Sequence, residues 1–206
     1  MNYQEKHRKS YIRIGEIYFW TATINNWMKL LMSDQYKDII ISSFRYLSNA
    51  GKIDVFAFVI MPNHIHVIWR INAMNGKETA QGSFLKYTAH EFGKLLLRED
   101  PAMLSLYTVD ASNKLYEFWQ RDPLAIHLYS REVAYQKLDY LHRNPTAKHW
   151  QLTNDYLNYT YSSVRFYELD LKEYDFLKDL REEFGFVFRE TRTTAGIKMM
   201  TLKRSL

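Results

Sequence analysis

The stretch FVIMPNHIHVIWRI, Phe58 to Ile71, decides the expected fold, because it contains two apolar strands separated by Met61-Pro62-Asn63. Proline cannot donate a hydrogen bond to a sheet ladder, and asparagine favours turns. A tight connection or bulge is therefore expected at these three residues. The stretch predicts two neighbouring strands, of which the second is a central strand of the sheet.

Two histidines, His64 and His66, stand in the second of these strands. Residues two apart in a strand share a face and lie roughly 7 Å apart at the backbone. Both imidazoles therefore project the same way, while Ile65 and Val67 point to the opposite face, into a core. Two neutral imidazoles on one strand form a ready pair of metal ligands. The alternative is a histidine pair on a solvated sheet face that binds no metal.

The flanking sequence completes an α+β plan. Its order is strand, helix, strand, strand, helix, strand, helix, which predicts a ferredoxin-like βαββαβ antiparallel sheet with helices on one face plus an added C-terminal helix that carries Tyr140. The expected segments are a strand over 17–30, a helix over 35–52 capped by Asp34, a helix over 83–100 capped by Ser83, a strand over 114–120, a helix over 131–144 and a last helix over 171–186.

Composition limits the classes of protein to which the chain can belong. A length of 206 residues fits one domain, expected over 1–186, followed by a tail over 187–206 with five basic residues and one acid. The absence of cysteine excludes disulfides and thiolate catalysis. No apolar run reaches the roughly 18 residues of a membrane span, and residues 1–15 lack the apolar core of a secretory signal. We therefore expect a cytoplasmic protein, with no membrane partner, whose net charge of +5 permits a polyanionic one.

The helix over 131–144 carries a second chemical pattern, because Tyr140 and Asn144 lie four residues apart and so share a helix face. Asn144 offers an amide oxygen for a hard divalent cation, and Tyr140 offers a phenol that can attack as a nucleophile. Lys137 lies beside the pair. An ordinary packing role is the alternative for Tyr140. Tyr135, on the same helix, is a weaker candidate because position 139 is Asp rather than Asn or Gln.

The two patterns together, MPNHIHVI followed by YLHRNP, resemble the HUH-type single-tyrosine transposases, in particular the REP-associated tyrosine transposases. The resemblance runs from about Tyr11 to Tyr167. It includes FWQRD and YSSVRFY, which are similar to a strand and a C-terminal segment of that family.

This resemblance implies that His64, His66 and Asn144 bind Mg²⁺ or Mn²⁺ and that Tyr140 cleaves single-stranded DNA. The implied function is a metal-dependent DNA endonuclease and strand transferase, a transposase that forms a 5′-phosphotyrosine intermediate on hairpin-bearing DNA. A homodimer is also implied, with Tyr140 working in cis or in trans. Two other functions stay open: a domesticated palindromic-DNA-binding protein with weak or no cleavage activity, and a metal protein that binds no nucleic acid.

Several side chains are candidates for contact with DNA because they combine charge, hydrogen-bonding capacity or a flat ring. Trp119 has burial in the core as its equal alternative, and Lys86 shares a helix face with His90. The candidates are Lys137, Arg143, Lys86, Trp119 and Gln120.

Overall fold

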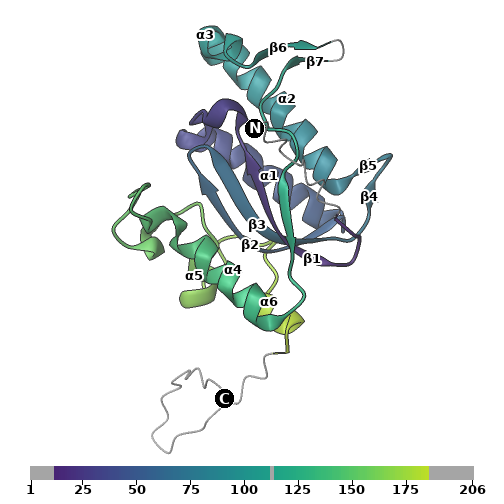
Figure 1. Cartoon of the computed structure of the whole chain (residues 1–206), viewed down its shortest axis with the longest axis vertical. Helices are drawn as coiled ribbons and strands as arrows, with labels where there is room; N and C mark the ends of the chain where they lie inside the picture. The colour runs from purple at the N-terminus through teal and green to yellow at the C-terminus, as the bar shows by residue number, and fades with distance from the viewer. Residues whose placement is uncertain (1–11, 112–113, 186–206) are drawn as a thin grey trace, which may run out of the picture.

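The computed structural model describes residues 12–111 and 114–185 and shows a mixed α+β protein built on a four-stranded antiparallel sheet (Figure 1). The predicted tail over 187–206 lies outside the described residues. Within the described part of the chain, no helix combines the length and apolarity needed to cross a bilayer. The elements are β1 (Ile17–Thr23), η1 (Asn25–Trp27), η2 (Leu30–Met32), α1 (Asp34–Asn49), β2 (Ile53–Met61), β3 (His64–Ile71), β4 (Met74–Asn75), β5 (Glu78–Thr79), α2 (Ala80–Glu99), α3 (Pro101–Ser105), β6 (Thr108–Ala111), β7 (Lys114–Tyr116), β8 (Leu124–His127), α4 (Arg131–Arg143), η3 (Asn144–Thr146), η4 (Tyr156–Asn158), α5 (Val164–Glu168) and α6 (Leu180–Glu183).

The main sheet has the strand order β2-β3-β1-β8, and every neighbouring pair is antiparallel. The predicted break between two neighbouring strands is confirmed, because Pro62 and Asn63 separate β2, an edge strand, from β3. The register sets Thr21 of β1 opposite His66 and Thr23 opposite His64. Cross-strand partners point to the same face, so these four side chains share one side of the sheet.

The fourth strand of the sheet is not the predicted one. We expected a strand over 114–120, whereas the structure places β7 in a small separate hairpin with β6 and uses β8 as the fourth strand. The apolar residues of that segment pack in the core instead, because Phe118 and Trp119 are both buried there. Only a single bridge, from Trp119 to Ile24, continues the segment along the end of β1.

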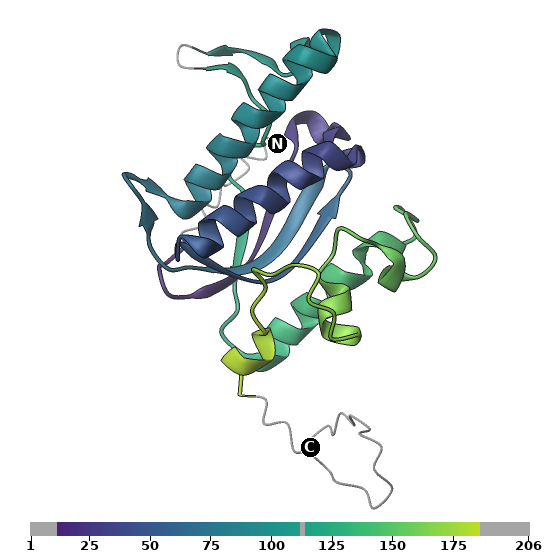
Figure 2. The same ribbon diagram turned by 180° about the vertical axis from the view of Figure 1, so that it is seen from behind.

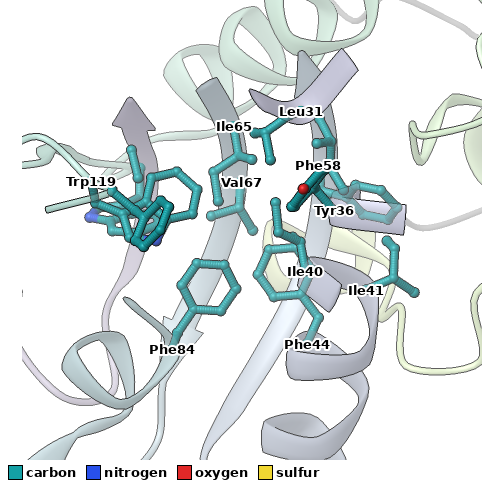
Figure 3. Packing of buried hydrophobic residues seen from close by; sticks show 14 of the residues in the cluster. Leu31, Tyr36, Ile40, Ile41, Phe44, Phe58, Ile65, Val67, Phe84 and Trp119 are labelled. Carbon is teal, nitrogen blue, oxygen red and sulfur yellow. The ribbon is translucent and has the colours of Figure 1, made fainter. Parts of the chain in front are cut away.

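Helices α1 and α2 cover one face of the sheet, as the two turned views show (Figures 1 and 2). Their apolar side chains meet those of β1 to β3 in a large aromatic core (Figure 3). The ring centroids of Trp20 and Trp69 lie 4.7 Å apart, and those of Phe44 and Phe84 lie 5.0 Å apart. Ile65 and Val67 are fully buried in this cluster, which confirms the face predicted for the residues that alternate with the histidines.

Helix α4 packs on the opposite face of the same sheet. Its apolar stripe of Ala134, Leu138 and Leu141 is buried against a second cluster that includes Phe19 and Ile68. The expectation of helices on one face therefore holds for α1 and α2 but does not extend to α4. An apolar helix stripe needs an apolar surface to cover, and the first face is already occupied. Helix α4 consequently lies on the histidine side of the sheet.

Two helix starts differ from the expected ones. Helix α1 begins at Asp34, and Ser33 rather than Asp34 occupies the capping position. Helix α2 begins at Ala80, because the Oγ1 atom of Thr79 accepts a hydrogen bond of 3.0 Å from the backbone N–H of Gly82. Ser83, the expected cap, instead accepts a hydrogen bond from the side chain of Asn75.

The helix predicted over 171–186 is wrong for most of its length, since the structure has only the short helix α6 there. The chain before α6 covers the open edge of β2 instead. The backbone N–H of Lys178 donates to the carbonyl of Val55 at 2.9 Å, and Leu177 forms a parallel bridge with the same residue. Covering an edge strand satisfies its backbone groups and blocks unwanted pairing.

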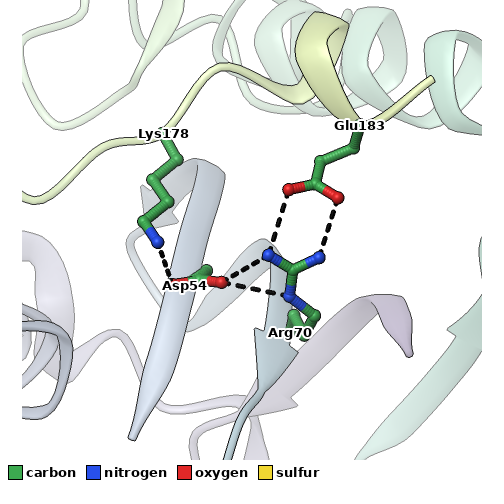
Figure 4. Close-up of polar contacts among 4 residues, drawn as sticks. All are labelled: Asp54, Arg70, Lys178 and Glu183. Atoms are coloured by element: carbon green, nitrogen blue, oxygen red, sulfur yellow. Dashed lines mark hydrogen bonds and ion pairs between the residues drawn. The ribbon is translucent and has the colours of Figure 1, made fainter. Parts of the chain in front are cut away.

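An ion-pair network connects the segment that contains Lys178 and Glu183 to strands β2 and β3 (Figure 4). Arg70 of β3 contacts Asp54 of β2 at 2.6 Å and Glu183 of α6 at 2.7 Å, and Lys178 contacts Asp54 at 2.6 Å. Burial alone would raise the pKa of Asp54, but hydrogen bonds from Lys178 and Arg70 outweigh it and hold that pKa below its usual value.

Candidate active site

The histidine pair lies on the α4 side of the sheet, and both rings are largely shielded from solvent. The exposed fractions are 8% for His64 and 6% for His66, and their ring centroids are 4.7 Å apart. The shared face predicted from their spacing in the strand is what brings them this close. Phe19 stacks on His66 at 5.0 Å and closes one side of the pair.

Each imidazole is oriented by a hydrogen bond through its Nδ1 atom. The Nδ1 atom of His64 lies 2.7 Å from Oδ1 of Asn63, and Nδ1 of His66 lies 2.7 Å from Oγ1 of Thr21. An amide oxygen only accepts, so Nδ1 of His64 donates and its Nε2 atom keeps the lone pair. The Nε2 atom of His66 is buried and makes no hydrogen bond within the described part of the chain. A buried nitrogen without a partner is suited to a metal ion.

The environment also keeps both rings neutral, which is the protonation state that ligates metals. Burial, and secondarily the charge of His149, lowers the pKa of His64 to about 4. Burial, followed by the charges of His64 and Lys137, lowers the pKa of His66 to about 3. At neutral pH neither ring has to lose a proton before it can bind a cation.

Tyr140 approaches this pair from α4. Its ring centroid is 5.5 Å from that of His66 and 5.9 Å from that of Phe19, and its side chain is 50% exposed. The amino group of Lys137 lies 5.6 Å from the Tyr140 ring centroid and 5.3 Å from that of Phe19. The structure thus brings a half-exposed phenol, a buried imidazole and a lysine together within one chain.

Tyr135, the weaker nucleophile candidate, has a different environment. Its ring packs against the second apolar cluster, and Arg131 lies over it at 6.0 Å. Burial raises the pKa of Tyr135 to about 12, which disfavours the phenolate. Which of the two tyrosines acts as a nucleophile stays a prediction.

Asn144 closes the C-terminal end of α4 and is buried. Its Nδ2 atom donates to the carbonyl oxygen of Tyr140 at 3.0 Å, so Oδ1 is the atom left for another partner. The chain that follows returns over the histidines, because the Trp150 ring lies 5.5 Å from that of His64. The role of Asn144 as a metal ligand stays a prediction.

The neighbouring His142 has a structural role that the sequence did not indicate. It is buried, and its Nε2 atom lies 2.9 Å from Oγ of Ser163, which also accepts from the backbone N–H of Phe58 at 3.0 Å. Tyr167 adds a hydrogen bond from its hydroxyl to the carbonyl of Phe56 at 2.8 Å. The motifs YLHRNP and YSSVRFY are therefore joined through the edge of β2, and this link fixes α4 over the histidine face.

The charged DNA-contact candidates divide into one residue inside the cluster and two outside it. Lys137 lies beside Tyr140, as described above. Arg143 is exposed, pairs with Asp139 of α4 at 2.6 Å and lies 5.6 Å from the Tyr156 ring centroid. Lys86 belongs to α2, across the sheet, where it pairs with Glu78 at 2.6 Å in a shallow surface hollow that His90 also lines.

Trp119 and Gln120 have separate environments although they are adjacent. Trp119 is 6% exposed, and its indole N–H donates to Thr88 at 2.9 Å, so the burial alternative describes it and we leave it out of the proposed DNA contacts. Gln120 is half-buried, and its backbone N–H donates to the carbonyl of Thr23 at 2.8 Å. It therefore lies at the end of β1 that pairs with His64.

The side-chain donors of His64, His66 and Asn144 would supply some, but not all, of the ligands of a first-row divalent cation. No group of three His, Asp or Glu side chains is placed to hold a metal among residues 12–111 and 114–185. Two imidazoles with an amide oxygen leave positions for phosphate oxygens or water, and nitrogen ligands favour Mn²⁺ over Mg²⁺. Thr21 and Asn63, which orient the rings, were not among the predicted site residues. The position of Asn63 directly before His64 was visible in the sequence, whereas the role of Thr21 depends on the register of β1 against β3.

Comparison with known proteins adds a similarity of fold. No protein-family model matches the chain, and no curated protein matches it. Among solved structures, the chain is similar to one described as the REP-associated tyrosine transposase bound to a REP hairpin. The TM-score is 0.56 and the identity 16%, over 96% of this chain and 100% of that chain. The fold is therefore shared with a tyrosine transposase across nearly the whole length of both chains.

Proposed function

We propose that this chain is a metal-dependent, single-stranded DNA endonuclease and strand transferase of the HUH type, with Tyr140 as its nucleophile. The observation that carries the proposal is the 5.5 Å separation between the ring centroids of Tyr140 and His66. The similarity to a hairpin-bound tyrosine transposase supports it at the level of the fold. The strand order β2-β3-β1-β8 is the order that a ferredoxin-like βαββαβ plan gives when β8 is its last strand.

The proposed reaction exchanges one phosphate ester for another. The phenol oxygen of Tyr140 forms a bond to phosphorus, and the bond from phosphorus to the 3′ oxygen breaks. The released 3′ oxygen takes up a proton, and the phenol proton is lost to solvent or to a base. The 5′-phosphotyrosine retains an ester bond, so a 3′ hydroxyl of another strand can reverse the step without ATP.

The described residues have separate tasks in this scheme. His64 and His66, with Asn144 as the proposed third ligand, would hold Mg²⁺ or Mn²⁺, which when bound neutralises charge on the phosphate oxygens. Lys137 adds a positive charge beside Tyr140. Asn63 and Thr21 hold the two rings in the orientation that binding requires.

A homodimer stays part of the proposal. The edge of β2 is covered by Ser162 and by Leu177, whereas β8 pairs only with β1 in the described part of the chain. A dimer formed by strand pairing would therefore use β8. Because Tyr140 and His66 meet within one chain, we propose that each subunit acts in cis.

The second candidate function is a palindromic-DNA-binding protein that does not cleave. The hairpin in the similar solved structure favours DNA binding without bearing on cleavage. A metal protein that binds no nucleic acid is the third candidate, supported by the histidine pair alone.

One experiment separates the three functions. The protein is incubated with hairpin oligonucleotides that carry single-stranded flanks, in Mn²⁺. Native electrophoresis of one portion detects DNA binding, and denaturing electrophoresis of the other detects a covalent adduct. We expect a protein–DNA adduct that Tyr140→Phe abolishes and that EDTA prevents. The matched control is Tyr46→Phe, an exposed tyrosine on α1 across the sheet. Binding without adduct supports the second candidate, and no DNA binding at all supports the third.

A further inference from the structure

An exposed tryptophan whose backbone is hydrogen-bonded to Asn63, the partner of His64, has a backbone conformation that is costly for its type. Trp27 in η1 is 63% exposed and has φ of 57°, and the preceding Asn26 has φ of 53°. Positive φ is tolerated by asparagine but is a true outlier for a bulky side chain. Such strain persists only where the surrounding structure enforces it, and it concentrates at functional sites.

The surroundings of Trp27 hold its backbone firmly. Its N–H donates to the carbonyl of Ile24 at 3.0 Å, and its carbonyl accepts from Nδ2 of Asn63 at 3.2 Å. The backbone N–H of Asn25 donates to the carbonyl of Phe118 at 2.7 Å. The indole therefore faces solvent from a turn that is tied to the β2–β3 connection and to the segment that follows β7.

The same asparagine connects the tryptophan to the proposed metal site. Asn63 holds Trp27 through its Nδ2 atom and accepts from Nδ1 of His64 through its Oδ1 atom. One amide side chain thus fixes both the backbone that displays the indole and the ring that would bind the cation. The backbone of Trp27 is therefore held at a set position relative to His64.

We propose that Trp27 is a stacking platform for one unpaired DNA base beside the phosphate that is cleaved. This inference rests on the proposed function and adds the residue that would set the position of the strand. Every base has a flat face, so an exposed indole on a held backbone can stack on it without reading its identity. The exposed neighbours of Trp27 are the polar Asn26 and the basic Lys29, which suit the phosphates on either side of a base better than an apolar protein interface.

The test measures binding rather than cleavage, so all variants are made in the Tyr140→Phe background. Affinity for a hairpin oligonucleotide with single-stranded flanks is measured by fluorescence anisotropy. Trp27→Ala should weaken binding by about tenfold, the usual order for loss of one stacked base, and Trp27→Phe by less than about threefold. Tyr46→Ala, which removes an equally exposed ring on α1, should leave the affinity unchanged.

A second arm locates the base. Each flank nucleotide is replaced in turn by an abasic residue, and one replacement should remove the difference between the parent and Trp27→Ala. Thermal melting verifies that each variant is folded. Unchanged affinity in Trp27→Ala, while the parent still binds DNA, overturns the stacking role and leaves the proposed function standing. If Trp27→Ala instead changes the oligomeric state in size-exclusion chromatography with no effect on DNA affinity, the surface serves a protein partner. A parent that binds no DNA overturns the proposed function itself.

Discussion

The ring of Tyr140 lies 5.5 Å from the ring of His66, between centroids, and both belong to the same chain. The phenol is half exposed, whereas the imidazole is buried and its Nε2 atom has no hydrogen-bond partner among the described residues. A half-exposed phenol ring therefore lies beside a buried imidazole that has one nitrogen without a partner among the described residues.

The hydrogen bonds to the Nδ1 atoms should control metal affinity. Asn63→Ala removes the acceptor for His64, and Thr21→Val removes the partner of His66. Loss of such a partner typically weakens metal binding by about 10- to 100-fold, and we expect that range for Mn²⁺ in isothermal titration calorimetry. Tyr46→Phe is the control. Mn²⁺ affinities equal to that of the parent in both variants would mean that the two rings are not the ligands.

Lys137 and Arg143 should contribute unequally to the rate of adduct formation, although both lie on α4. Lys137 lies beside the Tyr140 ring, while Arg143 is paired with Asp139 on the outer side. We expect Lys137→Met to lower the rate of adduct formation by about tenfold, or ~1.4 kcal/mol, and Arg143→Met by less than about twofold. The measurement is the initial rate on denaturing gels. Equal effects would contradict the position assigned to Lys137.

Ser163→Ala should destabilise the protein without removing any proposed ligand. The change leaves the buried Nε2 atom of His142 and the N–H of Phe58 without their partner. Leaving buried polar groups unpaired costs about 1–3 kcal/mol, so the midpoint of urea denaturation should fall accordingly. Ser105→Ala, at an exposed helix end, should change stability by less than about 0.5 kcal/mol. A midpoint unchanged by Ser163→Ala would show that this link does not hold α4.

The Asp54 network should make stability depend on acid pH. The pKa of Asp54 is lowered in the folded protein, so its contribution is complete above the unfolded value near 3.8 and is lost as the pH falls through the folded value. Asp54→Asn should therefore cost about 2 kcal/mol at neutral pH and much less at an acid pH well below the unfolded value. Urea denaturation at both pH values measures this difference, with Asp139→Asn as the exposed control. A cost that does not change with pH would contradict the ion-pair account.

The parts of the site that follow from local periodicity could be predicted from sequence. Strand alternation alone placed His64 and His66 on one face and Ile65 on the other, and helix spacing separated Tyr140 from the apolar stripe of α4. Those periods depend on backbone geometry, which is the same in every protein.

The parts that depend on long-range packing could not be predicted in this way. The residues around Trp119 are typical of a strand, but the Trp119 ring is buried in the core. The fourth strand of the sheet is therefore β8 and not the segment that contains Trp119. The segment before α6 does not form the predicted helix, because the backbone N–H of Lys178 donates to the edge of β2. The partnership of Thr21 with His66 requires the register of two strands, which the sequence pattern does not specify.

The central claim is that Tyr140 itself becomes attached to DNA, and peptide mass spectrometry after nuclease and trypsin digestion of the Mn²⁺ reaction tests it most directly. Trypsin separates the two candidate tyrosines, because cleavage after Lys137 and Arg143 leaves Tyr140 in the peptide 138–143 and Tyr135 in the peptide 132–137. We predict a nucleotide remnant on the peptide 138–143. A remnant on the peptide 132–137, or cleaved DNA with no modified tyrosine, would contradict the account.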